Sequence, residues 1–326
     1  MSLLEIKNLT IEFETLRGPI RPVEGLSLCL NEGETIGIVG ESGSGKSLTS
    51  LAVMGLLPEN AKICADVLSF EGQDLLKISE SERRKLRGGA MARIFQDPMT
   101  SLNPSFTVGF QIIEALRVHQ RGTRAELKRR ACELLEQVGI PDPESRLDAY
   151  SFQLSGGMSQ RVMIAIAIAG KPRLLIADEP TTALDVTIQA QILRLLKELQ
   201  KDFGMALMLI THNIGVVAQM ADHLTVAYAG EIVEDGSIRK ILENPRHPYT
   251  KGLLDCLPEM HDETEHRQKL ASIPGLVPDL LQRPLGCQFS PRCSQKQSDC
   301  DSKRIPMIES NERKFRCLHP FVEVQR

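Results

Sequence analysis

The sequence predicts an α/β fold in which helices cover both faces of a mostly parallel sheet. Short apolar runs alternate with longer helical patterns through much of the chain, as they do in proteins built on parallel strands. A glycine-rich loop joins one of these runs directly to a helix. The chain has 326 residues, of which 42% are hydrophobic. This length is sufficient for two domains, or for one large domain with an appendage.

The N-terminal elements are predicted to be strands followed by a helix. Residues 3–13 alternate apolar and polar side chains, as a strand with one buried face does, and a second strand is expected near 23–30. Residues 35–39 form a short β-branched run, and a helix is expected over 47–57. The glycine-rich loop therefore lies between a strand and a helix.

The middle of the chain is predicted to be mostly helical. A charged helix is expected at 80–88, a short strand at 93–95, and amphipathic helices between about 105 and 150. Strands and helices then alternate. The expected strands are 173–178, 205–210 and 224–234, and the expected helices begin at the turn 155–157 and cover 186–203 and 213–221.

Composition and charge exclude several classes of function. The net charge of −3 gives no electrostatic basis for general nucleic-acid binding. The longest strongly apolar run, Val162–Ala169, is far shorter than a membrane span. The first residues lack the basic and apolar stretches of a secretion signal. We therefore expect a cytosolic chain that does any membrane work through a partner.

The segment Gly40–Ser47 fits the phosphate-loop pattern G-x-x-x-x-G-K-[ST] in its required place between a strand and a helix. Glycines let backbone N–H groups turn toward phosphate oxygens, and the helix N-terminus adds a favourable dipole. Lys46 is predicted to contact the β- and γ-phosphates, and Ser47 to bind Mg²⁺. A glycine-rich turn with a chance Lys-Ser is the alternative, which the flanking strand and helix disfavour. The predicted nucleotide-binding residues of the loop are Gly40, Ser42, Gly43, Gly45, Lys46 and Ser47.

Two carboxylates end the apolar run at 174–177. Asp178 is suited to bind Mg²⁺ through water, and Glu179 to polarise an attacking water. His212 follows another apolar strand and is expected at the ligand-binding edge of the sheet, against the γ-phosphate. Gln96 ends a short strand, so its side chain is predicted to reach Mg²⁺ or the water. Each residue alone could be structural or solvated, but together with the phosphate loop they favour a hydrolytic site.

A second glycine-containing turn, Ser155-Gly156-Gly157, opens a helix and forms a second predicted phosphate-binding surface. One chain would hardly need two phosphate-binding surfaces for one nucleotide. The second surface therefore suggests that two chains share each nucleotide. Phe13 is a candidate for stacking on the nucleotide base through its π-face. Because Phe13 ends an alternating strand, a place in the core is the competing interpretation.

Together these motifs resemble those of ATP-binding-cassette (ABC) transport ATPases over residues 1 to about 240. The resemblance implies a RecA-like ATPase core, an N-terminal antiparallel β subdomain and an α-helical subdomain at about 97–155 that grips a membrane subunit. It also implies a head-to-tail dimer, with each ATP held between the phosphate loop of one subunit and the signature motif of the other. The residues that the signature motif and the D-loop contribute are Ser155, Gly156, Gly157, Gln160 and Asp185.

Residues 95–104, 246–250 and 273–275 resemble a narrower branch of this family, the importers of oligopeptides, dipeptides and nickel. This resemblance implies an ATPase that powers peptide import at the cytoplasmic face of the bacterial inner membrane. The implied partners are a second, different ATPase subunit, two membrane permease subunits and a periplasmic or extracellular substrate-binding protein. The cargo stays open among peptides, haem, nickel and antimicrobial peptides. Asn213 departs from the family, in which an Asp usually follows the switch histidine, and we expect it to tune activity modestly.

Two other functions remain compatible with these motifs. The first is a soluble ABC ATPase of the repair or translation type, although such relatives carry long coiled coils or paired cassettes that this chain lacks. The second is a metal-sensing module in which ATP is secondary. Loss of ATPase activity on Glu179→Gln, with activity retained after Cys→Ser changes, would disfavour the metal sensor.

Prolines become frequent after residue 242, which predicts a boundary near 245 between an ABC domain, 1–245, and a C-terminal extension, 246–326. Four of the eight cysteines crowd into the last forty residues, at a spacing too loose for a standard zinc knuckle. Four thiolates suit either Zn²⁺ or an iron–sulfur cluster, and four unliganded cysteines are the third alternative. The resemblance of 286–293 to related importer ATPases implies a [4Fe–4S] cluster. The candidate ligands are Cys287, Cys293, Cys300 and Cys317.

Overall fold

The computed structural model describes residues 2–182, 184–257 and 272–321, and the chain divides into two compact units. Unit 1 is formed mainly by Glu71–Ile210. Unit 2 combines Leu4–Cys29, Thr35–Phe70 and Thr211–Arg326. Each unit has buried strands of its own. None of the helices in the described ranges is both long and apolar enough to cross a membrane.

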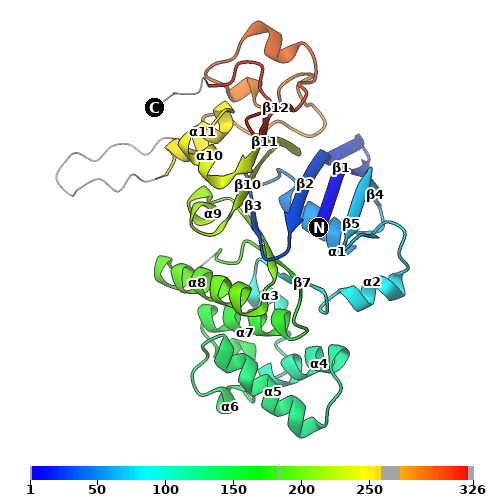
Figure 1. The fold of residues 1–326 in the computed structure, drawn as a ribbon, viewed down its shortest axis with the longest axis vertical. Helices are drawn as coiled ribbons and strands as arrows, with labels where there is room; N and C mark the ends of the chain where they lie inside the picture. The colour runs from blue at the N-terminus through cyan, green and yellow to red at the C-terminus, as the bar shows by residue number, and fades with distance from the viewer. Residues whose placement is uncertain (1, 183, 258–271, 322–326) are drawn as a thin grey trace, which may run out of the picture. The chain divides into compact units, whose positions relative to one another are not determined.

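Unit 1 is built on three short parallel strands (Figure 1). The central strand, β8 (Leu174–Asp178), pairs in parallel with β7 (Met91–Ile94) on one side and with β9 (Ala206–Thr211) on the other. Every residue of β8 and β9 is buried. Continuous burial is typical of parallel strands that are covered on both faces, so these strands form the core of the unit.

Four long helices of unit 1 each begin after a side chain that caps their first turn, namely Thr107, Thr123, Ser155 and Asp185. These helices are α4 (Val108–His119), α5 (Arg124–Gln137), α7 (Gly156–Ile168) and α8 (Val186–Phe203). Helix α7 contacts β7 as well as α4, α5 and α8 (Figure 1). The shorter elements are β6 (Gln73–Asp74), α2 (Glu80–Leu86), α3 (Pro98–Ser101), α6 (Pro143–Arg146) and the 3₁₀ turn η1 (Ser151–Gln153).

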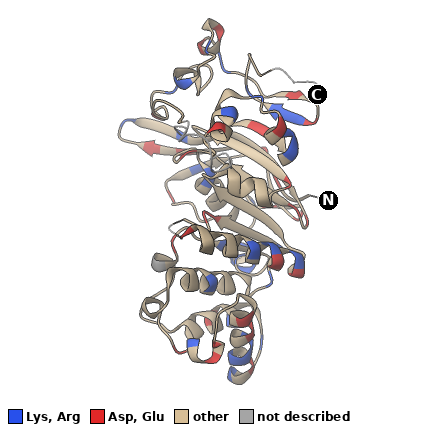
Figure 2. Cartoon of the chain, turned by 90° about the vertical axis from the view of Figure 1, so that its left-hand side faces the viewer, with Lys and Arg blue, Asp and Glu red and all other residues tan. Residues whose placement is uncertain are grey.

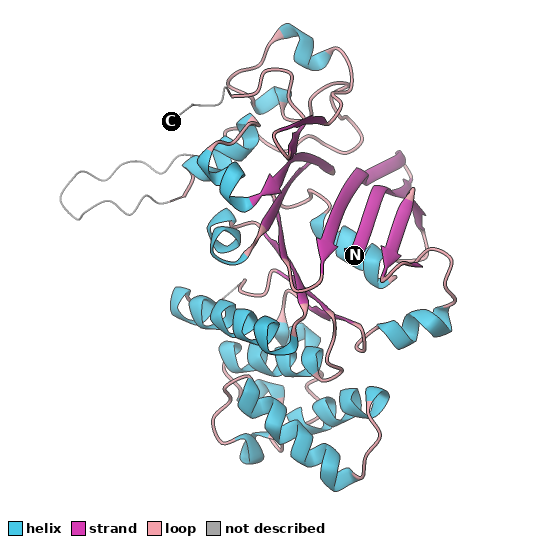
Figure 3. Ribbon diagram, viewed as in Figure 1, coloured by secondary structure: helices cyan, strands magenta, loops and turns pink. Residues whose placement is uncertain are grey.

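Unit 2 contains an antiparallel sheet close to the N-terminus (Figure 3). β1 (Ser2–Thr15) pairs antiparallel with β4 (Ala61–Cys64) and β5 (Val67–Phe70), and β2 (Gly18–Asn31) lies along its other edge. The structure therefore confirms the antiparallel N-terminal subdomain that the family resemblance implied. It adds β4 and β5, which the sequence analysis did not predict.

The second sheet of unit 2 changes from parallel to antiparallel. β3 (Thr35–Val39) and β10 (His223–Tyr228) are parallel, whereas β11 (Glu231–Ser237), β13 (Arg313–Phe315) and β12 (Ile308–Ser310) follow β10 in antiparallel succession. The C-terminal extension thus supplies two strands to this sheet. The helices and 3₁₀ turns of the unit are α1 (Lys46–Met54), α9 (Ile214–Met220), α10 (Ile238–Glu243), α11 (Pro248–Asp255), η2 (Ser290–Arg292) and η3 (Ser298–Asp301).

The strands β3, β9 and β10 carry no Lys, Arg, Asp or Glu. Elsewhere charged residues of both signs are spread over strands, helices and loops, as Figure 2 shows. This distribution agrees with the small net charge of −3. Burial of the apolar strands and of the helix faces that contact them provides the main driving force for folding each unit.

Two elements, α1 and β7, end earlier than the sequence predicted. Helix α1 ends at Met54 rather than near residue 57, because Gly55 has a left-handed φ of 61° and closes the helix. β7 ends at Ile94, and the Phe95 side chain that follows it is 43% exposed. In both places the chain leaves its element earlier than the apolar pattern suggested.

Candidate functional site

The glycine-rich loop of unit 2 connects β3 to α1, and its glycines are required by its geometry. Gly43 and Gly45 have left-handed φ values of 81° and 88°, which a side chain would strain. A Cβ on Gly40 would lie 2.0 Å from the carbonyl oxygen of Ala227. The loop therefore owes its tight curve and its close approach to neighbouring backbone to the absence of side chains.

The ammonium group of Lys46 lies inside this loop. Its Nζ donates to the carbonyl oxygens of Gly40 and Glu41, at 2.7 and 2.8 Å, and to Ser44 Oγ at 3.1 Å. Lys46 is only 5% exposed. Ser42 is exposed, and Ser47 in the first turn of α1 is half-buried. A fixed cation beside a helix N-terminus is an arrangement that binds anions.

Glu179 of unit 1 follows β8 directly and has a left-handed φ of 48°. Its carboxylate oxygen Oε2 accepts from Gln96 Nε2 at 2.9 Å and from Thr182 Oγ1 at 2.8 Å. A left-handed conformation is strained for a residue with a side chain, and such strain is concentrated at functional sites. The structure brings the predicted residues Gln96 and Glu179 together and adds Thr182, which the sequence analysis missed.

Asp178 ends β8 and is only 2% exposed. Its Oδ2 accepts from Arg93 Nη2 of the neighbouring strand β7 at 2.6 Å. The Arg93 side chain is itself only 7% exposed. Charged hydrogen bonds of this kind are short and fix orientation, so Arg93 holds the end of β8 in place. Sequence analysis did not identify Arg93, because it precedes Asp178 by 85 residues.

The Ser155-Gly156-Gly157 turn lies at the N-terminus of α7. Ser155 Oγ accepts from the Met158 N–H at 3.3 Å, and both Ser155 and Gly156 are exposed. Gln160 differs, because it is 1% exposed and its amide nitrogen has no hydrogen-bond partner among the described residues. The surface that the turn presents therefore consists of its first residues and does not include Gln160.

The remaining nucleotide-site candidates lie near element ends. Asp185 is exposed and caps α8 by accepting from the Ile188 N–H at 2.9 Å. His212 directly follows β9 and is exposed. Asn213 caps α9 by accepting from the Gly215 N–H at 2.9 Å, which an Asp could also do. Phe13 is half-buried on β1, opposite a residue of β4.

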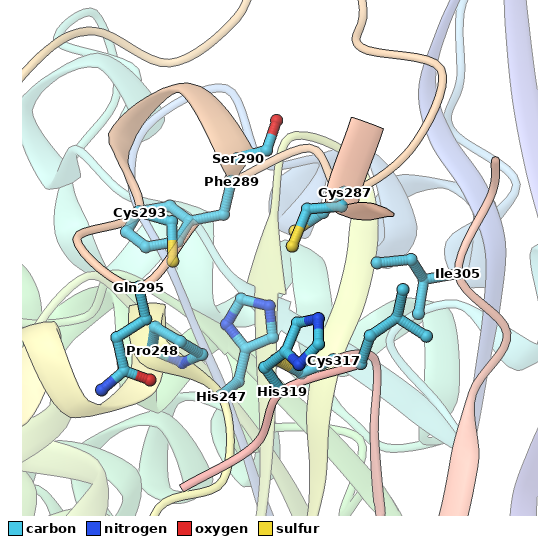
Figure 4. Close-up of a pocket in the computed structure, with 12 residues that line it drawn as sticks. His247, Pro248, Cys287, Phe289, Ser290, Cys293, Gln295, Ile305, Cys317 and His319 are labelled. Atoms are coloured by element: carbon cyan, nitrogen blue, oxygen red, sulfur yellow. The ribbon is translucent and has the colours of Figure 1, made fainter. Parts of the chain in front are cut away.

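The four C-terminal cysteines line one pocket of unit 2, although the chain separates them by up to thirty residues. Figure 4 shows Cys287, Cys293 and Cys317 around this hollow, together with His247 and His319. All four thiols are free. No three of their sulfurs lie within 4.8 Å of one another, whereas donor atoms of Asp299, Cys300 and His319 do. The pocket thus gathers the predicted ligands in one place.

Burial shapes the chemistry of this pocket. Desolvation raises the pKa of Cys287 to about 11 and that of Cys317 to about 12, because the thiolate loses its hydration. Cys293 is shifted in the same direction for the same reason. These thiols are therefore protonated at neutral pH unless a cation stabilises the thiolates, which is how metal sites are normally occupied.

Almost the whole chain matches known proteins and protein families in sequence. Residues 23–182 match the family model "ABC transporter", and residues 233–300 match "Oligopeptide/dipeptide transporter, C-terminal region". The chain is 53% identical to the dipeptide transport ATP-binding protein DppD of Escherichia coli (strain K12), over 100% of this chain and 99% of that protein. It is 48% identical to the oligopeptide transport ATP-binding protein OppD of Bacillus subtilis (strain 168), over 98% of this chain and 89% of that protein.

Solved structures share the fold of most of the chain. A dimeric post-hydrolysis state of the ATP-binding cassette MJ0796, bound to ADP and Pi, matches with a TM-score of 0.64 and 28% identity over 72% of this chain and 99% of that chain. CbiO1 of Clostridium perfringens, part of an ABC transporter complex, matches with a TM-score of 0.62 and 27% identity over 74% of this chain and 91% of that chain. These similarities agree with the α/β fold described above.

Proposed function

The chain belongs to the ABC transporter family, in its oligopeptide and dipeptide branch, and from this premise we propose that Gly40–Ser47 bind the phosphates of ATP while Glu179 activates the attacking water. The chain is an ATPase subunit that drives peptide import. Its relatives are transport subunits, so a soluble repair or translation ATPase is not favoured. ATP is the substrate and Mg²⁺ the accompanying cation.

The loop supplies the binding part of this proposal. Backbone N–H groups and the N-terminus of α1 attract phosphate. Lys46 is already buried in the curve of the loop, so its ammonium group exchanges loop oxygens for phosphate oxygens without leaving its place. We propose His212 as a further contact of the γ-phosphate and Phe13 as the residue that stacks on the base.

Hydroxyl, carboxylate and amide oxygens fit Mg²⁺, which prefers hard oxygen donors. The proposed donors are Ser47, Asp178 and Gln96. When bound, Mg²⁺ neutralises charge on the β- and γ-phosphates. Arg93 orients Asp178 through its 2.6 Å hydrogen bond, so the carboxylate is positioned to hold a magnesium-bound water.

Hydrolysis depends on Glu179, and the observation that carries this part is the pair of hydrogen bonds that fix its carboxylate. A carboxylate held in one orientation can take the proton of a water molecule that attacks the γ-phosphate. Positioned bases of this kind typically contribute a factor of about 10²–10⁴ to a rate. Gln96 and Thr182 therefore act as orienting groups for the base.

Replacing Glu179 tests the assignment. We expect Glu179→Gln to bind ATP with unchanged affinity while phosphate release falls by about 10²–10⁴-fold. Glu198→Gln removes an exposed carboxylate from α8 of the same unit and should keep the full rate. Hydrolysis by Glu179→Gln at more than a tenth of the normal rate would show that another group is the base.

As a peptide-importer ATPase, the chain works with membrane permease subunits and a substrate-binding protein. We propose that it binds the permeases at the cytoplasmic face of the bacterial inner membrane, through residues of about 97–155. We also propose that Ser155, Gly156 and Asp185, all exposed at helix N-termini, complete the ATP site of a second, different ATPase subunit. Gln160, which the sequence analysis grouped with these residues, is buried in α7 and is not part of this surface.

We further propose that the extension after residue 245 holds a [4Fe–4S] cluster on Cys287, Cys293, Cys300 and Cys317. Thiolates around a single tetrahedral Zn²⁺ lie about 3.8 Å apart, given Zn–S bonds of about 2.3 Å. The sulfurs here are spread more widely than that, which favours a larger group. Anaerobically purified protein should absorb at about 400 nm, the region of sulfur-to-iron charge transfer. A colourless protein with stoichiometric zinc would refute the cluster.

A further inference from the structure

Arg292 of the C-terminal extension forms an ion pair with the glycine-rich loop. Its Nη1 donates to Oε2 of Glu41, the second residue of the loop, at 2.8 Å. The Arg292 side chain is 4% exposed and that of Glu41 is 29% exposed. Because this ion pair is largely shielded from water, removal of one partner leaves the other with an uncompensated charge. The loop is thus anchored to a residue far from it in sequence.

The guanidinium group of Arg292 is held from the other side by backbone and aromatic groups. Nε donates to the Pro274 carbonyl at 2.8 Å, and Nη2 donates to the Ile273 carbonyl at 3.2 Å. Nη1 also donates to Tyr228 Oη at 3.2 Å. Because a planar guanidinium has donors in fixed directions, these bonds leave Arg292 little freedom. Glu41 therefore meets a rigid partner.

Tyr249 of α11 makes a second attachment to the same loop residue. The Glu41 backbone N–H donates to Tyr249 Oη at 2.9 Å. Tyr249 is fully buried and packs against Tyr228 and Phe289, at centroid distances of 4.6 and 5.4 Å. Burial raises the pKa of Tyr249, so its phenol stays neutral. Side chain and backbone of Glu41 are both held by residues that follow β11.

The same segment carries the cysteine pocket. Arg292 directly precedes Cys293, and Phe289 lines the pocket beside Cys287 and Cys293. The Arg292 guanidinium lies 5.9 Å from the centre of the Phe289 ring. One short stretch of chain therefore contacts both the cysteine pocket and the loop. A shift of its backbone would move the guanidinium group that binds Glu41.

We propose that Arg292 is a positioning residue for ATP binding: through Glu41 it sets the conformation of the glycine-rich loop, with Tyr249 as a second anchor. The inference rests on the proposed role of the loop in phosphate binding. It makes the C-terminal extension a support of the nucleotide site. Arg292 touches no reacting atom and acts only through the loop.

A double-mutant cycle on ATP affinity tests the proposal. We expect Arg292→Gln and Glu41→Gln each to weaken ATP binding by the full-length chain by roughly 10-fold, because each releases the same anchor. The affinity of the double variant for ATP should be no lower than that of the single variant with the lower affinity. KM should rise while kcat stays within about twofold, since Glu179 and its orienting groups are unchanged. Arg292→Lys, which keeps the charge but not the fork of donors, should lie between the wild type and Arg292→Gln.

Matched controls separate this proposal from the one on which it rests. Arg239→Gln breaks an exposed ion pair with Glu243 on α10 of the same unit and should leave ATP affinity unchanged. Lys46→Ala should abolish binding. If Lys46→Ala has no effect, the loop is not the phosphate site and both proposals fail. If Lys46→Ala abolishes binding while Glu41→Gln has no effect, or the effects of Glu41→Gln and Arg292→Gln simply add, the positioning role alone is overturned.

Discussion

The carboxylate of Glu179 owes its orientation to two hydrogen bonds that meet at one oxygen atom, Oε2. Gln96 reaches it from the end of β7, and Thr182 reaches it from three residues further along the chain. Because both donors converge on Oε2, rotation of the carboxylate would break both bonds together. A base that cannot rotate is pre-organised for proton transfer.

Removal of one of these donors should slow hydrolysis without changing ATP binding. We expect Thr182→Val to reduce the rate of phosphate release by about 10–100-fold, the equivalent of one hydrogen bond to a charged group. Thr182→Ser keeps the hydroxyl and should retain most of the activity. Full activity of Thr182→Val, measured beside equilibrium ATP binding, would show that Gln96 alone orients Glu179.

His119 at the end of α4 should make unit 1 sensitive to mild acid. Its ring lies so near the Gly88-Gly89 turn that a Cβ on Gly88 would come within 2.6 Å of Nε2. Partial burial lowers the pKa of His119. Between the folded and unfolded pKa values the unfolded chain binds the extra proton, so stability falls as pH drops below about 6.5. Melting curves of His119→Gln between pH 5 and 8 should show a weaker pH dependence than the wild type, and identical curves would contradict this.

The packing of α9 against β3 provides an element-scale constraint next to the glycine-rich loop. A Cβ on Gly37 of β3 would lie 2.1 Å from Cγ1 of Val217, a fully buried residue of α9. The helix can approach the strand this closely only because Gly37 has no side chain. β3 leads directly into the loop, so this contact also fixes where the loop begins.

A paired substitution tests this packing. Gly37→Ala should lower the free energy of unfolding by about 1–3 kcal/mol through overpacking. Combining it with Val217→Ala should cost less than the sum of the two single changes, because the smaller side chain makes room for the new methyl group. Denaturant unfolding of the three variants measures the coupling. Strict additivity would mean that α9 moves away from β3 instead.

At the scale of elements, the helices and strands that could be predicted are those with a characteristic local sequence pattern. β8 and β9 are continuous apolar runs, and α8 has a capping Asp and an amphipathic pattern. β12 and β13 have three residues each, and β13 pairs with β11, which precedes it by about eighty residues. No local pattern reveals such a pairing. Arg292 escaped detection for the same reason, since its contact with Glu41 joins residues 251 positions apart.

At the scale of the whole molecule, the candidate residues are distributed over both units, with Lys46 and His212 in unit 2 and Gln96, Glu179 and Ser155 in unit 1. The motif set and the fold class followed from the sequence, because each motif is a short run with its own chemistry. The contacts that hold Glu41 could not be predicted, since they join residues 208 and 251 positions apart.

The exposed turn at Ser155 should matter only in the assembled transporter. We expect Ser155→Arg to leave ATP binding by the isolated chain within about twofold of the wild type, and to reduce hydrolysis by the assembly at least about 100-fold. Thr123→Arg removes the N-cap of α5 in the same unit. It serves as the control for the loss of a helix cap, which lowers the free energy of unfolding by about 1 kcal/mol. Full hydrolysis by an assembly that carries Ser155→Arg would rule out a shared site.

The ion pair between Glu41 and Arg292 also sets an order of events during biosynthesis. The two residues are 251 positions apart, and a ribosome that adds about 5–20 residues per second needs roughly 13–50 s to travel from one to the other. For the first 208 of these positions the nascent loop has neither anchor, because Tyr249 is also made late. A chain that is released early therefore lacks a finished phosphate loop, so truncated products would compete poorly for ATP and would not occupy a transporter as active subunits.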